Sequence, residues 1–178
     1  MTVTQEQRDE VRRRANFACE FCGVTETDTA GQLTIDHFKP RSKGGEDNLD
    51  NLLYACVRCN QFKQDYWPET DSEPSLWNPR LESPEQHFLA LDDGTLISLT
   101  AVGEFTLRRL RLNRPPLVSF RQRKWEQSEN LRLLIHYRNL VSLLTQLNQQ
   151  LETLTSQQQK LLNTQRELLN ILLGIEED

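Results

Sequence analysis

The stretch Leu33-Thr34-Ile35-Asp36-His37 decides the fold, because two cysteine pairs with the spacing of metal-binding knuckles bracket it. Cys19-x-x-Cys22 precedes it and Cys56-x-x-Cys59 follows it, and the two pairs use all four cysteines of the chain. Four thiolates from two such knuckles form the ligand set of a closed, tetrahedral structural zinc site. A redox role is disfavoured, because there are two pairs and no thioredoxin-like βαβ pattern. The sequence therefore predicts a structural Zn²⁺ held by these four cysteines.

The residues between and after the cysteine pairs predict a strand, a loop, a second strand and a helix. Residues 32–37 alternate in polarity and are rich in β-forming residues, so we expect a strand there. The polar loop 39–50 contains the breakers Pro40 and Gly44-Gly45. Residues 51–55 suit a second strand and residues 56–64 a short helix.

The flanking segments supply further elements. Thr4 and Gln7 have the spacing of a capping box, which predicts a helix from Gln5 to about Ala15. The Asp92-Asp93-Gly94 sequence between two apolar runs predicts a β-hairpin. The expected elements after the cysteine region are irregular chain at 65–84, strands at 88–91 and 95–99, and a helix at 105–112.

Leucine recurs at every seventh residue near the C-terminus, as in a coiled coil. The period predicts helix from Leu131 to Leu173, and three arrangements are open. These are a coiled coil that forms a homodimer, a helical hairpin that folds back near 156–159, and a helix whose leucine stripe packs on residues 91–112 of the same chain. The leucines of this series are Leu133, Leu140, Leu147, Leu154, Leu161 and Leu168, and Ile175 continues it.

The composition is that of an ordinary soluble protein, with 37% hydrophobic and 26% charged residues. No apolar run reaches the roughly 18 residues of a membrane span, and the N-terminus has no secretory pattern, so we expect a cytoplasmic protein with no membrane partner.

The formal net charge of −5 argues against a nucleic-acid partner, but residues 108–124 carry seven basic residues and no acidic one.

Taken together, these motifs resemble the HNH endonuclease family. The resemblance covers roughly residues 12–64 and implies the ββα-metal fold in its four-cysteine zinc variant, with DNA as the substrate. The motifs that carry it are Asp36-His37-x-x-Pro40-x-Ser42-x-Gly44-Gly45, Asn48-Leu49-x-Asn51-Leu52 and Cys56-x-x-Cys59-Asn60-x-x-Lys63.

The resemblance implies a role for each of four residues. His37 matches the general base that deprotonates the attacking water, and Asp36 matches a ligand of the catalytic metal. Asn60 stands where many members have histidine and would be the second ligand. Asn51 matches the central asparagine, which braces the loop and the base. Because an asparagine binds a hard ion through oxygen, Mg²⁺ or Mn²⁺ is favoured as the catalytic ion.

The residues themselves suit phosphodiester hydrolysis. A histidine titrates near neutral pH and is therefore a suitable base, and a divalent ion can relieve charge on the phosphate. Basic side chains near the motif and in the later basic segment are candidates for phosphate contacts, with solvated surface charge as the alternative. The candidates are Lys39, Arg41, Lys43, Lys63, Arg108, Arg109, Arg121 and Arg123.

We therefore expect an α+β protein with three segments: a nuclease domain at 1–66, a linker with a hairpin and a basic helical region at 67–130, and a helical segment at 131–178. The predicted function is metal-dependent hydrolysis of DNA. One alternative is a non-catalytic zinc module that binds nucleic acid or protein. Another makes the C-terminal coiled coil the main functional part, with the nuclease as the effector of a larger assembly.

Overall fold

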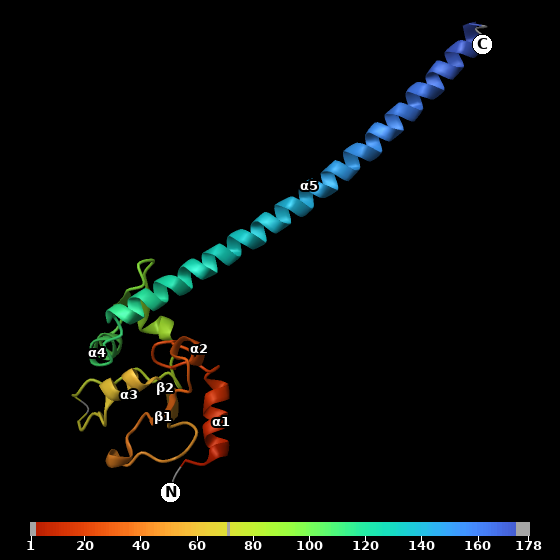
Figure 1. Cartoon of the computed structure of the whole chain (residues 1–178). Coiled ribbons are helices and arrows are strands. Elements are labelled where there is room, and N and C mark those ends of the chain that lie inside the picture. The colour runs from red at the N-terminus through yellow and green to blue at the C-terminus, as the bar shows by residue number, and fades with distance from the viewer. Residues whose placement is uncertain (1–2, 71, 174–178) are drawn as a thin grey trace. The chain divides into compact units, whose positions relative to one another are not determined.

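The computed structural model describes residues 3–70 and 72–173, and it divides into two compact units, 1–126 and 127–178. Unit 1 holds small antiparallel hairpins and short helices, and the described part of unit 2 is helical (Figure 1). The expected α+β class, with a small hairpin domain at the N-terminus and a long helix at the C-terminus, is confirmed.

A two-stranded sheet and one helix form the centre of the cysteine region. Strand β1 (Thr34–His37) pairs antiparallel with β2 (Leu52–Ala55), with His37 opposite Leu52 and Thr34 opposite Ala55. Helix α3 (Val57–Lys63) follows β2 directly and contacts β1. The connection between the strands contains a 3₁₀ turn, η1 (Arg41–Lys43). The predicted order of strand, loop, strand and helix is therefore confirmed.

Two helices precede β1, and each begins at a capping box. Helix α1 (Gln5–Arg14) begins after Thr4, whose side chain accepts from the Gln7 backbone, as the sequence predicts. Helix α2 (Glu26–Thr29) begins after Thr25 in the same way, with Asp28 as the reciprocal partner. The elements expected from the sequence do not include this helix, although its Thr-x-x-Asp spacing is the local pattern that marks a helix start.

The segment after α3 packs against the cysteine knuckles. It contains the 3₁₀ turn η2 (Pro84–Gln86), the hairpin β3 (Phe88–Ala90) and β4 (Leu96–Ser98), and helix α4 (Ala101–Arg109). One hydrophobic core joins both regions. Its buried members include Cys19, Phe21, Cys59, Trp77, Phe88, Leu110, Leu112, Leu117 and Phe120.

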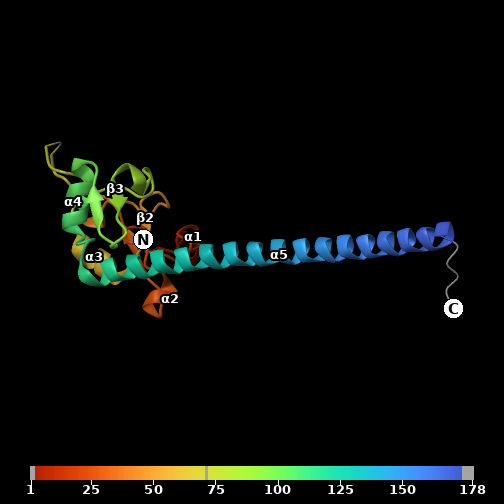
Figure 2. The ribbon, with the colours of Figure 1, turned by 90° about the horizontal axis from the view of Figure 1, so that it is seen from above.

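Helix α5 (Pro115–Leu173) runs from unit 1 into unit 2. It begins at Pro115, where a proline is tolerated because the first N–H groups of a helix lack intrahelical partners. The helix is continuous through 156–159, so the hairpin alternative is wrong (Figure 2). The heptad leucines from Leu133 to Leu168 are 46–60% exposed, and Ile175 lies outside the described residues. No described helix has an apolar stretch suited to crossing a membrane.

Candidate metal centre and active site

The four cysteines of the two knuckles converge on one point. Their sulfur atoms all lie within 4.8 Å of one another, and the Sγ atoms of Cys22 and Cys56 are 3.7 Å apart. Four sulfurs around a tetrahedral Zn²⁺ with bonds of about 2.3 Å would be separated by about 3.8 Å. Cys56 caps α3 and Cys59 lies in its first turn, so the helix itself sets half of the geometry. The cysteines are therefore positioned to bind a metal ion, consistent with structural zinc.

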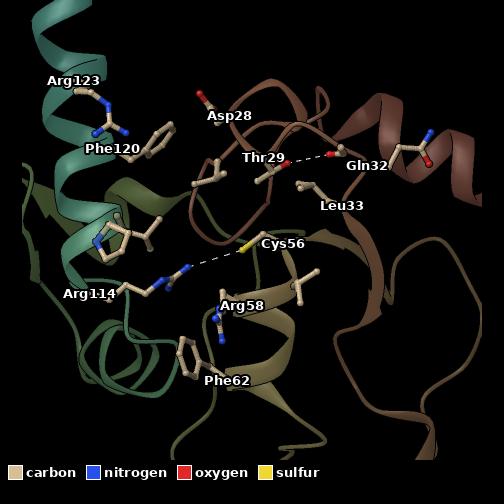
Figure 3. Close-up of a pocket in the computed structure, with 15 residues that line it drawn as sticks. Asp28, Thr29, Gln32, Leu33, Cys56, Arg58, Phe62, Arg114, Phe120 and Arg123 are labelled. Atoms are coloured by element: carbon tan, nitrogen blue, oxygen red, sulfur yellow. Dashed lines mark hydrogen bonds between the residues drawn. The ribbon is translucent and has the colours of Figure 1, made fainter.

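Arg114, immediately before α5, brings a cation to this cluster. Its Nη2 lies 4.0 Å from Cys56 Sγ and 3.9 Å from Cys59 Sγ (Figure 3). The same side chain donates through Nη1 to the carbonyl oxygens of Leu110 and Arg111, at 3.1 and 3.2 Å. Because thiolates around a divalent ion carry net negative charge, a guanidinium at this position offsets charge that would otherwise be buried.

His37 ends β1, and its ring contacts a carboxylate. Nε2 of His37 lies 2.8 Å from Oδ1 of Asp47, and Arg41 binds the same carboxylate with Nε at 2.8 Å and Nη2 at 2.6 Å. The Arg41 guanidinium, and to a lesser extent His37, holds the pKa of Asp47 below its usual value. An ionised carboxylate only accepts hydrogen bonds, so Nε2 is the protonated nitrogen in neutral His37, and Nδ1 keeps its lone pair.

Asp36 points toward α3, where it forms an ion pair with Lys63. The Lys63 Nζ lies 3.2 Å from Asp36 Oδ2 and donates to the His37 carbonyl oxygen at 2.6 Å. The Lys63 side chain is fully buried. Desolvation raises the pKa of Asp36 and lowers the pKa of Lys63, while their mutual attraction opposes both shifts. The lysine that the sequence analysis assigned to phosphate contacts thus lies inside the protein.

Asn51 braces the loop between β1 and β2. Its side chain accepts from the Lys39 N–H at 2.8 Å and donates to the carbonyl oxygens of Lys39 and Glu46, at 3.0 and 2.9 Å. Gly45 permits this close approach, because a Cβ at that position would lie 1.8 Å from the Lys39 oxygen. The loop that carries Asp47 is therefore held against the end of β1 through backbone contacts.

Asn60 lies one turn before Lys63 on α3. Its amide nitrogen donates to the Thr34 hydroxyl at 3.3 Å, two residues before Asp36 on β1. Asp36 Oδ2 is buried and, apart from its ion-pair contact with Lys63 Nζ, forms no hydrogen bond with the described residues. The two side chains offer carboxylate and amide oxygens, the donors that Mg²⁺ and Mn²⁺ prefer, so the residues present fit a hard divalent ion.

Of the other residues predicted to contact phosphate, some are held by neighbouring groups of the protein and others are exposed. Lys39 Nζ lies over the Trp67 ring at 5.4 Å, and exposed Lys43 pairs with Glu69 at 2.6 Å. Arg109 stacks on Tyr66 and donates to the Lys63 carbonyl oxygen, while Arg121 donates to the carbonyl oxygens of Gly94 and Leu112. Arg108 and Arg123 are exposed.

The fold and the cysteine cluster agree with the comparison of the sequence with known families. Residues 19–65 match the family model described as HNH endonuclease, so this part of the chain is an HNH endonuclease domain. A curated relative, the Septu protein PtuA of Bacillus mycoides (strain KBAB4), is 26% identical over 150 residues. The match covers 68% of this chain and 21% of that protein, so the chain corresponds to about a fifth of the length of this relative.

Asp47 and Arg114 were not among the residues expected from the sequence. Asp47 follows Gly45 by two residues in the loop, and the opposite charges of Arg41 and Asp47 within one short loop were the available hint. Arg114 is far from Cys56 in the sequence, and no local pattern links it to a cysteine. Its place depends on the packing of the later segment on the knuckles.

Proposed function

We propose that this protein is a metal-dependent endonuclease that hydrolyses DNA phosphodiester bonds. The HNH domain match supports this proposal, and the observation that carries it is the position of His37 at the end of β1, oriented by Asp47 and next to Asp36 in the sequence. The assignment also accounts for Asn51, which fixes the loop that carries the orienting carboxylate.

In this proposal, His37 is the general base. Its Nε2–H donates to Asp47, so Nδ1 accepts the proton of the attacking water, and the imidazolium that forms is stabilised by the Asp47 carboxylate. Asp36 and Asn60 hold the catalytic Mg²⁺ or Mn²⁺, which supplies charge relief at the phosphate and at the leaving oxygen. Lys39 and Arg41, on the same loop, are the nearest candidates for contacts to flanking phosphates.

The four cysteines hold a structural Zn²⁺ in this proposal. Metal elemental analysis of purified protein should give close to one Zn²⁺ per chain. Cys59 is fully buried in the main core, so Cys59→Ser should unfold unit 1 rather than only slow catalysis. A stably folded protein that contains no metal would contradict this assignment.

We also propose that the C-terminal helix forms a homodimer through its heptad leucines. An exposed apolar stripe of this length is a solubility liability for a single chain, and a second copy would cover it. Each HNH centre cuts one strand, so a two-fold dimer would bring two centres to one duplex. The cytoplasmic location expected from the sequence is part of the same proposal, since a reducing compartment keeps the cysteines available for metal.

One observation favours a second candidate, a non-catalytic zinc module that binds nucleic acid or protein. Lys63 places its ammonium group at Asp36, where the nuclease proposal needs a divalent ion, and so neutralises the carboxylate without metal.

A nicking assay distinguishes the two functions. Supercoiled plasmid should be nicked in Mg²⁺ or Mn²⁺ and not in EDTA, and His37→Ala should slow nicking by roughly 10²–10⁴-fold, the usual contribution of a general base. Equal rates for His37→Ala and the unaltered protein would exclude His37 as the base.

A further inference from the structure

A cavity of about 700 Å³ lies in unit 1 (Figure 3), and its lining includes none of His37, Asp36 and Asn60. The start of α5, the segment around α2, and α3 form its walls. This volume is within the range of ligand pockets, roughly 300–1,000 Å³. Its lining includes the apolar side chains of Val24, Leu33, Val57, Phe62, Leu117 and Phe120.

The polar part of the lining is positively charged. Arg58, Arg114 and Arg123 line the cavity, and Arg114 is engaged with the cysteine sulfurs. Arg58 and Arg123 are exposed, and neither pairs with a carboxylate among the described residues; Arg58 contacts the Gln61 amide. Asp28, the lining carboxylate, lies 3.7 Å from Lys124. The cavity therefore combines an apolar floor with two uncompensated guanidinium groups.

This combination selects a ligand that has an apolar face and an anionic group close together. A nucleotide has both, because the base presents a flat face and the phosphate carries the charge. A base in a duplex has its faces stacked against its neighbours and presents only its edges, so duplex DNA cannot fill an apolar floor. A nucleotide in an unpaired strand can place its base in the cavity and its phosphate against the arginines.

The position of the cavity beside the start of β1 fits a DNA strand that also passes His37. Leu33, in the cavity lining, directly precedes β1, and His37 ends that strand. Four residues of β-strand span about 13 Å at 3.3 Å per residue. A single DNA strand bound at His37 can therefore reach the cavity with a nearby nucleotide.

We infer that this cavity binds an unstacked nucleotide of a single DNA strand. The inference rests on the proposed function, since DNA is the substrate of the proposed nuclease. It adds a specificity: the protein prefers DNA with unpaired bases near the cut. Arg58, on α3, and Arg123, on α5, contact phosphates of the strand on either side of the nucleotide, and the apolar residues between them receive the base.

The test measures the binding of fluorescein-labelled DNA to full-length His37→Ala protein by fluorescence anisotropy. Three probes of equal length are compared: single-stranded oligothymidylate, the corresponding abasic strand and a duplex. Oligothymidylate should bind about tenfold more tightly than the abasic strand, because both carry the same phosphates and only the first can fill the apolar floor. It should also bind more tightly than the duplex.

Val57→Asp, added to the same protein, places a carboxylate in the cavity. Val57 is 53% exposed and opens α3, where an aspartate is well tolerated, so the fold should persist. The variant should lose the preference for oligothymidylate over the abasic strand. Leu89→Asp, at an equally exposed apolar residue of the β3 strand, is the matched control and should keep the preference.

Equal binding of the oligothymidylate and abasic strands would overturn the inference. Full competition by free thymidine monophosphate would overturn it too, because the occupant would then be a free nucleotide and not a strand. The proposed function has a separate readout in the nicking of plasmid by unaltered protein. Normal nicking together with no base preference rejects the cavity assignment alone, whereas absence of both nicking and DNA binding rejects the proposed function.

Discussion

His37 and Asp47 are joined by a contact of 2.8 Å between Nε2 and Oδ1, and this contact leaves Nδ1 as the ring nitrogen without a hydrogen bond among the described residues. The pair is completed by Arg41, which holds the carboxylate ionised. The consequence is a histidine with one defined tautomer at the end of a strand, and this geometry can be tested by substituting Asp47.

Asp47→Asn should slow plasmid nicking. The imidazolium that His37 forms on accepting a proton loses the carboxylate that stabilises it, and an amide no longer fixes Nε2 as the donor nitrogen. Nicking rates of the variant and the unaltered protein in the same Mg²⁺ buffer measure the loss. Asp50→Asn, at an exposed carboxylate of the same loop, should leave the rate unchanged. A rate for Asp47→Asn equal to that of the unaltered protein would remove Asp47 as the orienting residue.

Lys63→Met should lower the free energy of unfolding by about 3–5 kcal/mol, because it leaves the Asp36 carboxylate buried without its partner. The pKa of Asp36 is already raised by desolvation, so its charged form is the costly one in the folded state. The loss should therefore be small below that pKa and grow as the pH rises through it. Urea unfolding at acidic and neutral pH measures both effects.

Two controls make the Lys63 result specific. Lys63→Met combined with Asp36→Asn removes both charges and should recover part of the lost stability. Lys43→Met breaks an exposed pair with Glu69 and should change the free energy of unfolding little, because solvent screens that pair. If the single variant Lys63→Met were as stable as Lys43→Met, the buried pair would contribute nothing to the stability of the fold.

Arg114→Gln should release metal to a chromogenic chelator severalfold faster than the unaltered protein, because the thiolates of Cys56 and Cys59 lose their cation. Arg114→Lys keeps the charge but not the guanidinium geometry and should give an intermediate rate. Arg123→Gln, at an exposed arginine of α5, is the control. An unchanged release rate for Arg114→Gln would show that the arginine has no effect on the metal site.

Leu147→Glu should dissociate the proposed dimer, since it places a charge at the centre of the apolar stripe. Gln149→Glu introduces the same charge two residues away, outside the leucine series, and should leave the dimer intact. Light scattering on both full-length variants measures the molar mass. A monomeric unaltered protein would refute the dimer directly.

Local patterns in the sequence were sufficient for most elements of the cysteine region. The Thr4–Gln7 capping box, the alternation before His37 and the CxxC spacing each determine their structure within a few residues, and the structure confirms them. The burial of Lys63 could not be predicted from such local patterns. Its position one turn after Asn60 suggested a free cation, and only the packing of α3 on β1 shows that it meets Asp36.

Contacts distant in sequence account for the rest. The place of Arg114 at the cysteines depends on how residues 76–120 pack on the knuckles, and one-dimensional periodicity carries no information about that packing. For the C-terminal helix, the sequence pattern predicted the type of element but not its arrangement. Its seven-residue period predicted a helix correctly, but periodicity alone did not distinguish a continuous helix from one that folds back.

The shared core has a consequence for how this HNH domain can be recombined. Trp77, Phe88 and Leu110 are buried against residues of the knuckles, so an excised 19–65 segment would expose one face of its own interior. The domain is therefore not an autonomous cassette that can be transplanted by its motif boundaries. A graft or fusion that keeps the domain folded needs its junction after Glu126.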